Sequence, residues 1–98
     1  PVLSDALFGT FTVRSGALTT LSLPALANAE GAYFDFTDNA LSSSQVDAFL
    51  VQLAALGSPA ADNITLDISN QTPSAPPGTA GLAAISTLED FGGTITTD

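Results

Sequence analysis

Tyr33-Phe-Asp-Phe36 opens the stretch of sequence that decides the fold, and Ile64-Thr-Leu-Asp-Ile68 closes it. Between them lie the turn segment Thr37-Asp-Asn-Ala-Leu-Ser42, an apolar run with helical spacing from Ser44 to Leu56, and Gly57. Alternating apolar and polar side chains at the two ends predict strands, and the period of the middle run predicts a helix. The stretch therefore indicates a strand, a turn, a helix and a second strand.

The helix in this stretch has the clearest signals in the chain. Its apolar face consists of Val46, Phe49, Leu50, Leu53 and Leu56. Ser44 followed by Asp47 is similar to a capping box, and Gly57 stands where helices commonly end in a left-handed residue. The opposite face, with Val51 and Ala55, is less polar than a typical helix surface. We therefore expect other chains to cover part of this surface.

The same motif returns before the chain ends. Phe34-Asp-Phe-Thr-Asp-Asn39 aligns with Leu66-Asp-Ile-Ser-Asn-Gln71, 32 residues further on. After a proline-rich loop, a second helix is predicted from about Thr79 to Phe91, followed by a short strand at Thr94–Thr97. The buried residues predicted for this helix are Leu82, Ile85, Leu88 and Phe91. Strands joined by helices pair in parallel, so residues 32–98 are predicted to form an α/β fold with the order β-α-β-α-β.

The N-terminal part of the chain has a different pattern. Apolar and polar residues alternate from Leu7 to Val13, Arg14-Ser-Gly16 interrupts the run, and a second run extends from Leu18 to Leu23. This pattern predicts a β-hairpin within residues 1–24, in a single domain of 98 residues. Two roles remain open for the hairpin: it caps one end of the sheet, or it reaches as an arm to a neighbouring subunit.

The charged residues are ten carboxylates and one cation, Arg14, which gives a net charge of −9. Nucleic acids and anionic membranes are bound through several cationic groups, so we expect neither as a partner. The sequence has no Lys, His or Cys, and the usual activated nucleophiles and bases are therefore missing. We predict a protein that is not an enzyme, has no catalytic residues and needs no cofactor.

Asp35 and Asp67 occupy equivalent places in the two strands of the repeat. In adjacent parallel strands their Cα atoms would lie about 4.8 Å apart. Such a pair could share a proton or bind Ca²⁺, which makes the two residues a weak calcium candidate; the alternative is a solvated surface without a ligand. The other candidates for interaction with a partner are Tyr33, Thr65, Thr94 and Thr96.

These motifs resemble those of a known family. The pattern Leu18-x-x-Leu21-x-Leu23, together with the two aligned segments, resembles the Leu-x-x-Leu-x-Leu-x-x-Asn core of leucine-rich repeats, with Asn39 and Asn70 near the asparagine position. More narrowly, Asp38-Asn-Ala-Leu-Ser, Thr65-Leu-Asp-Ile-Ser and Gly93-Thr-Ile-Thr-Thr are similar to small leucine-rich-repeat-like modules of tailed-phage structural proteins and bacterial surface proteins. The resemblance covers Leu18 to Asp98. It implies a short solenoid with a binding or structural role.

Two functional hypotheses follow. In the first, the protein is a virion structural protein of a bacteriophage, a capsid decoration or tail-associated component. It forms a homo-oligomer whose partners are other copies of itself, a major capsid protein or a tail protein. In the second, it is an extracellular recognition module that binds a glycan or a protein through the face that carries Tyr33, Asp35 and Asp67.

Overall fold

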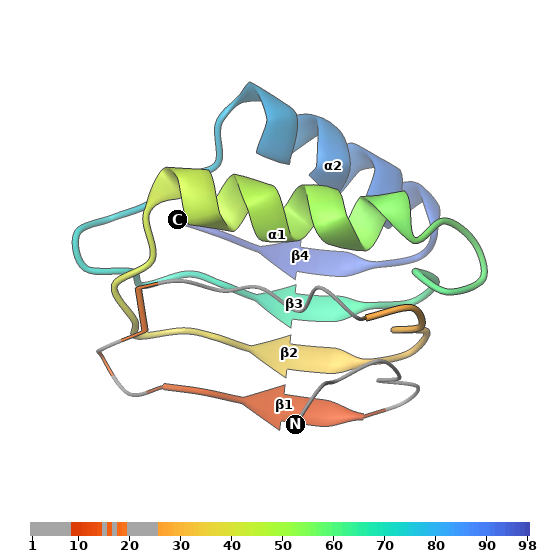
Figure 1. Cartoon of the computed structure of the whole chain (residues 1–98), viewed down its shortest axis with the longest axis horizontal. Helices are drawn as coiled ribbons and strands as arrows, with labels where there is room; N and C mark the ends of the chain where they lie inside the picture. Colours follow the sequence, from red (N-terminus) through yellow and green to blue (C-terminus); the bar gives the residue numbers. More distant parts are fainter. Residues whose placement is uncertain (1–8, 15, 17, 20–25) are drawn as a thin grey trace.

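The computed structural model describes residues 9–14, 16, 18–19 and 26–98 (Figure 1). The described strands are β1 (Thr10–Thr12), β2 (Tyr33–Asp35), β3 (Thr65–Asp67) and β4 (Thr94–Thr96), and the helices are α1 (Ser43–Ala55) and α2 (Thr79–Asp90). The strands form one sheet in the order β1-β2-β3-β4, and all neighbours are parallel. The fold is therefore mixed α/β, and the parallel pairing predicted from the repeat is confirmed.

The central residue of each strand points towards the helices. Phe11, Phe34, Leu66 and Ile95 share one row of the register. Phe34 and Leu66 are fully buried, and the Phe34 ring meets the ring of Phe49 from α1 edge to face, with centroids 5.7 Å apart. Because side chains alternate along a strand, the flanking residues of every strand point to the opposite, uncovered face.

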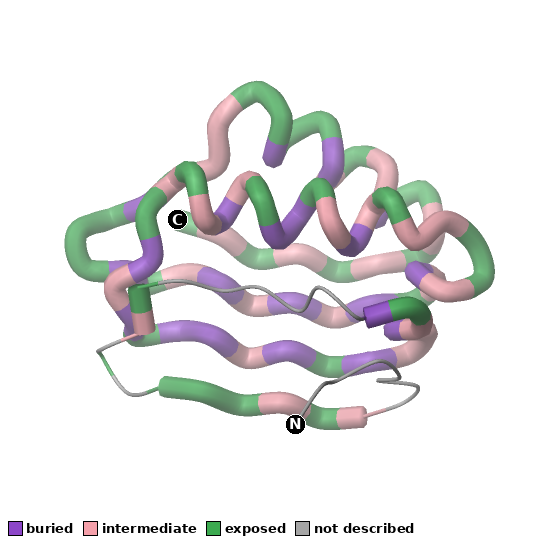
Figure 2. Tube along the Cα trace, viewed as in Figure 1, coloured by how far each residue is buried: buried purple, intermediate pink, exposed green. Residues whose placement is uncertain are grey.

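One apolar core joins the sheet to both helices (Figure 2). Its largest fully buried side chains are Phe34, Leu41, Val46, Phe49, Leu50, Leu53, Ile64, Leu66, Ile68 and Leu88. Burial of a side chain of this size stabilises a fold by roughly 1.5–3 kcal/mol. The apolar face predicted for the first helix is confirmed for Val46, Phe49, Leu50 and Leu53, whereas Leu56 is half-buried.

The backbone repeats the same turns around each central strand. A left-handed residue stands two positions before β2, β3 and β4, with φ angles of 68° at Gly31, 56° at Asn63 and 85° at Gly92. A second left-handed residue follows β2 and β3, at Asp38 (φ 59°) and Asn70 (φ 58°). Gly, Asn and Asp are the residues that adopt this conformation most readily. The sequence repeat is therefore a repeat of backbone geometry.

The first turn of α1 differs from the predicted capping box. Ser42 is the N-cap, and its Oγ accepts a hydrogen bond from the N–H of Gln45 at 3.3 Å. The carboxylate of Asp47 points to the other helix, where its Oδ1 accepts a hydrogen bond from the N–H of Gly78 at 2.8 Å. Gly78 is the N-cap residue of α2 and has no side chain for capping. Asp47 therefore supplies a polar contact between the starts of the two helices.

The buried face of α2 also differs from the prediction. Leu82 is 57% exposed, and Ile85 and Phe91 are only half-buried. The buried residues are Gly81, Ala84 and Leu88, so full burial is confirmed for Leu88 among the four predicted residues. The cause is close packing of the helices, because a Cβ added at Gly81 would overlap the Asp47 carboxylate. Small residues therefore form the contact face, and Leu82 is turned outward.

The N-terminal hairpin predicted for residues 1–24 is replaced, where the structure describes it, by parallel pairing. β1 joins the edge of the sheet beside β2, with Thr10 opposite Tyr33 and Thr12 opposite Asp35. Leu18 and Thr19 are not in a strand, and residues 20–25 of the predicted second hairpin strand lie outside the described residues. β1 is thus a member of the same sheet as the repeat.

Candidate functional site

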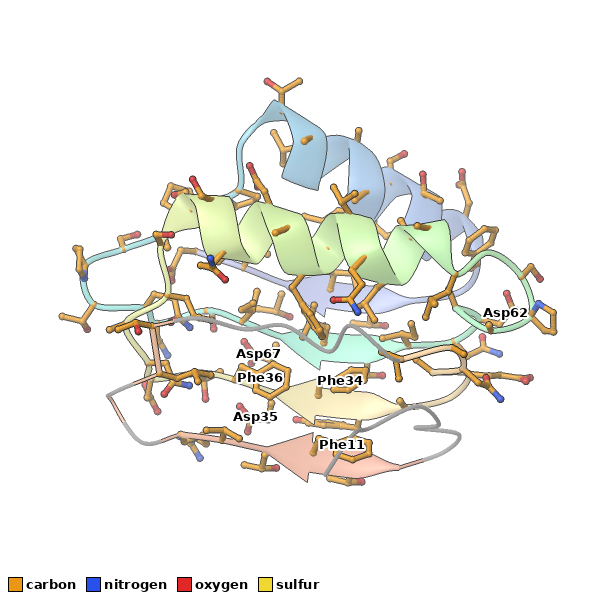
Figure 3. The ribbon with its side chains drawn as sticks, in the orientation of Figure 1. Phe11, Phe34, Asp35, Phe36, Asp62 and Asp67 are labelled. Carbon is orange, nitrogen blue, oxygen red and sulfur yellow. The ribbon has the colours of Figure 1, made fainter. Side chains whose placement is uncertain are left out.

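The uncovered face of the sheet presents two rows of side chains, and Figure 3 labels Asp35 and Asp67 from one of them. One row consists of Thr10, Tyr33, Thr65 and Thr94, and the other of Thr12, Asp35, Asp67 and Thr96. All six interaction candidates from the sequence therefore lie on one surface, which we call the open face. Tyr33 is its largest exposed side chain, at 43% exposure.

Each carboxylate of the open face is held by the residue two positions later. Asp35 Oδ1 accepts hydrogen bonds from the Thr37 hydroxyl at 2.7 Å and the Thr37 N–H at 3.1 Å. Asp67 Oδ1 accepts the equivalent bonds from Ser69, at 2.6 Å and 3.1 Å. The hydrogen bond from the Thr37 hydroxyl makes the largest contribution to lowering the pKa of Asp35. The Thr37 N–H and the charge of Arg14 lower this pKa by smaller amounts.

Asp35 and Asp67 are register partners in adjacent strands, as predicted from the repeat. In the described part of the chain, no third acidic, His or Cys side chain joins them to make a possible metal site. Ca²⁺ takes six to eight oxygen ligands, so this pair alone is a poor cage.

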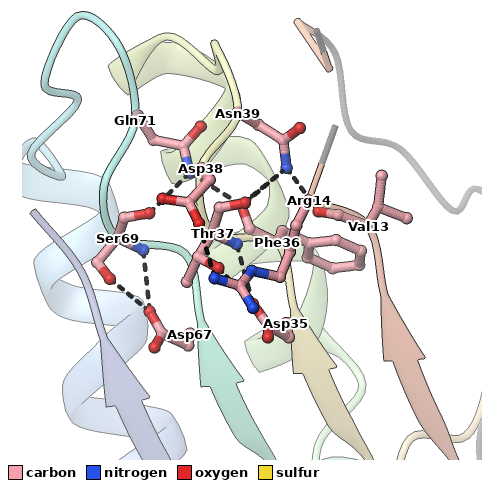
Figure 4. A network of polar contacts seen from close by, with 10 residues as sticks. All are labelled: Val13, Arg14, Asp35, Phe36, Thr37, Asp38, Asn39, Asp67, Ser69 and Gln71. Carbon is pink, nitrogen blue, oxygen red and sulfur yellow. Dashed lines mark hydrogen bonds and ion pairs between the residues drawn. The ribbon is translucent and has the colours of Figure 1, made fainter. Parts of the chain in front are cut away.

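The cation of the chain lies beside these carboxylates (Figure 4). Arg14 Nη2 contacts Asp38 Oδ2 at 2.8 Å, and both side chains are about half exposed. This hydrogen bond, with the fields of Asp38 and Asp35, raises the pKa of Arg14. An exposed ion pair contributes little to stability, but this one reduces the negative potential at one corner of the open face.

Two buried amides connect neighbouring strands at the end of the open face. Asn39 Nδ2 donates to the carbonyl oxygens of Val13 at 2.7 Å and Phe36 at 3.0 Å. Gln71 Nε2 donates to the carbonyl oxygens of Phe36 at 2.9 Å and Ile68 at 3.2 Å, and its Oε1 accepts from the N–H of Leu41 at 3.0 Å. Each amide therefore bonds to its own repeat unit and to the preceding one.

Gln71 is the counterpart of Asn39 in this arrangement, as in the repeat alignment, whereas Asn70, which is near the asparagine position of the family motif, has no such role. Asn70 is exposed and occupies the left-handed turn position. The repeat alignment indicates this equivalence, because Gln71 follows Asn39 at the repeat spacing of 32 residues.

The opposite side of the molecule has an open groove between the two helices. Its volume is about 360 Å³, and its lining residues are Val51, Ala54, Ala55, Ala80, Ala83, Ala84 and Thr87. Val51 at 44% and Leu82 at 57% exposure add further apolar surface to the helices. Neither α1 nor α2, the helices of the described residues, has the length and apolar character needed to cross a membrane.

Known proteins give no further assignment of this site. Comparisons of the chain with protein-family models, curated proteins and solved structures found no match.

Proposed function

We propose that the protein is a non-enzymatic virion structural protein, a capsid decoration or tail-associated component, built as a short leucine-rich-repeat-like solenoid. The observation that carries this proposal is the sheet, in which four parallel strands follow one another in chain order. In the described part of the chain, nothing pairs with the outer edge of β1 or β4. Sheets of this kind are extended by stacking and are used as assembly surfaces.

The buried amides support the solenoid part of the proposal. Asn39 and Gln71 repeat the same set of bonds from one unit to the next: each donates to the carbonyls that end its own strand and the preceding one, and each accepts from an N–H of the preceding unit, Leu18 or Leu41. The phage setting is supported by the resemblance of the strand and turn motifs. The residue types of the chain fit an assembly role as well, because its polar side chains, apart from Arg14, are carboxylates, hydroxyls and amides without His, Cys or Lys.

Quantitative mass spectrometry of purified phage particles from the source material tests this proposal. The expected result is a fixed ratio of this polypeptide to the major shell protein. A ratio near one per shell subunit assigns it to capsid decoration, and a few copies per particle assign it to the tail. Absence of the polypeptide from purified particles would contradict the proposal.

A recognition module is the second candidate, because Tyr33, Asp35 and Asp67 lie together on the open face. Their aromatic ring and carboxylates suit a glycan or a protein with hydrogen-bond donors. Asp35→Asn and Asp67→Asn together should abolish binding in a glycan-array screen performed with and without Ca²⁺. Asp90→Asn, on the exposed end of α2, is the matched control. A double variant that binds like the wild type would exclude this candidate.

A further inference from the structure

The two edge strands have a composition that is unusual for strands exposed at the ends of a sheet. β1 is Thr-Phe-Thr and β4 is Thr-Ile-Thr, whereas the carboxylates Asp35 and Asp67 stand on the interior strands. Soluble proteins commonly protect free edges with charges, prolines or bulges. Here the edge strands themselves have no charged side chain, and both consist of β-forming residues.

We propose that β4 of one copy pairs in parallel with β1 of a second copy, so that the sheet continues from chain to chain. The register of the sheet specifies the partners: Thr94 faces Thr10 of the second copy, and Thr96 faces its Thr12. This proposal deepens the assembly role proposed above and rests on it, since it names the partner as a second copy and the contact as edge to edge.

The hydrogen-bonding groups of the two edges match in this register. In β4 the Thr94 N–H donates to Ile64 and the Thr96 carbonyl accepts from Ile68, both at 2.9 Å. These residues therefore bond towards β3, and the alternation of a strand directs the Gly93 carbonyl and the Thr97 N–H outward. The same pattern directs the groups of Thr10 and Thr12 outward from β1, because Gly9 and Val13 bond to β2. In the proposed register the Thr10 N–H of the second copy faces the Gly93 carbonyl, and the Thr97 N–H faces the Thr12 carbonyl of the second copy.

The apolar row of the sheet ends incompletely at both edges. Phe34 and Leu66 in the interior strands are fully buried, whereas Phe11 and Ile95 at the ends are half-buried. Within the chain, the rings of Phe11 and Phe34 stack with centroids 5.4 Å apart. Pairing of two copies would place Ile95 beside Phe11 of the second copy and continue the row, which removes apolar surface from water at both ends.

The charges at the two ends are also complementary. Arg14 lies two residues after β1, and Asp98 lies two residues after β4. The proposed register places these two positions opposite each other between copies. Each whole chain has a net charge of −9, so copies repel one another at long range. Association should therefore become stronger as salt screens that repulsion.

A contact of β4 with β1 is heterologous, and such contacts produce rings or open filaments instead of symmetric dimers. This property allows a sharp test with Thr97→Pro. The substitution removes the outward N–H of residue 97, which has no acceptor among the described residues, and the extended backbone before it tolerates proline. Thr97→Ala keeps the N–H and is the matched control.

Sedimentation velocity over a range of protein concentrations, at low and high salt, provides the readout. We expect the mass of the wild type and of Thr97→Ala to rise with concentration and with salt, and Thr97→Pro to stay monomeric. Mixed with the wild type, Thr97→Pro should shorten the assemblies, because it still offers its β1 edge. A wild type that stays monomeric, or a Thr97→Pro variant that assembles like the wild type, would overturn the proposal. Far-UV circular dichroism verifies the fold of each variant.

Disulfide formation between two single variants tests the register. The natural chain has no Cys, and Cα atoms of paired parallel strands lie within the range that a disulfide spans. A mixture of Thr12→Cys and Thr96→Cys should form a crossed dimer on mild oxidation, in preference to either homodimer. A mixture of Thr10→Cys and Thr96→Cys, out of register, should give much less product. Equal yields from the two mixtures would refute the register.

These experiments separate the failure of this inference from the failure of the proposed function. If purified copies do not associate through their edges while the polypeptide is present on particles in a fixed ratio, the edge contact is wrong and the structural role stands. If the copies pair by their edges and no particle contains the polypeptide, the contact is right and the virion assignment is wrong.

Discussion

Replacement of Gln71 by Ala should be among the most destabilising polar substitutions in the chain. Gln71 is 5% exposed, and its Oε1 accepts from the N–H of Leu41, a residue that is 1% exposed. Loss of that acceptor leaves a buried N–H without a partner, which costs about 1–3 kcal/mol. The Phe36 carbonyl loses one donor but keeps Asn39. With roughly 1 kcal/mol for the remaining bonds, the expected loss is about 2–4 kcal/mol.

Urea unfolding followed by circular dichroism measures this loss. A domain of this size has a stability of about 5–15 kcal/mol, and each 1 kcal/mol lowers Tm by about 4–8 °C. The urea concentration at the midpoint should fall, while the m-value, the slope of the unfolding free energy against urea concentration, stays unchanged. Asn70→Gly is the matched control, because Asn70 is exposed and glycine accepts its left-handed backbone; it should change stability by less than about 0.5 kcal/mol. Equal effects of the two substitutions would refute the role assigned to Gln71.

Three further predictions test other parts of the fold. Gly81→Ala should destabilise by about 1 kcal/mol or more in thermal unfolding. The new Cβ would lie 2.9 Å from the Cβ of the Pro77 ring and would displace the Asp47 carboxylate from the Gly78 N–H. This outweighs the roughly 1 kcal/mol that alanine gains in a helix, and a stabilised variant would contradict the close packing. Thr37→Val should raise the pKa of Asp35 in a ¹³C NMR titration. The folded pKa of Asp35 is below its unfolded value, which is about 3.9. The ionised carboxylate therefore stabilises the fold above the unfolded pKa, and this stabilisation disappears as the pH falls through the folded pKa. Thr37→Val should weaken this pH dependence of stability, and an unchanged Asp35 titration would refute the role of Thr37. Leu82→Gln should change urea stability by less than about 0.5 kcal/mol, as expected for an exposed position, whereas a loss above 2 kcal/mol would indicate burial.

The order of elements from β2 to β4 could be predicted because the sequence repeats. Two alignable units with the same spacing of strand, turn and helix require the same backbone path, and helices between strands favour parallel pairing. The N-terminal strand could not be placed in the same way. A period of two indicates a strand but not its partner, and the turn-like Arg14-Ser-Gly16 favoured a hairpin where the sheet provides a parallel neighbour.

The open face could be predicted as a surface because alternation within a strand assigns each residue to one side. The six candidates required only this alternation and the repeat register. The contacts between the helices could not be found in this way. The link from Asp47 to Gly78 and the outward position of Leu82 depend on how closely α1 and α2 approach, and helical periodicity alone leaves that distance undetermined.

The chain departs from its own repeat at the two ends of the sheet, and the departures have opposite charge. In the interior units, the position two residues after the strand is Thr37 or Ser69, and each donates to the preceding carboxylate. After β4 that position is Asp98, whose carboxylate accepts from the N–H groups of Asn70 and Ala75 at 2.6 Å and 2.8 Å. After β1 it is Arg14, the one cation of the chain. All of these polar groups have partners within the chain, because Asp98 holds the preceding turn and Arg14 pairs with Asp38, but only the two ends place a charge at this position. The proposed edge contact between copies would bring these two opposite charges together, which makes it consistent with the departures of the two ends from the repeat.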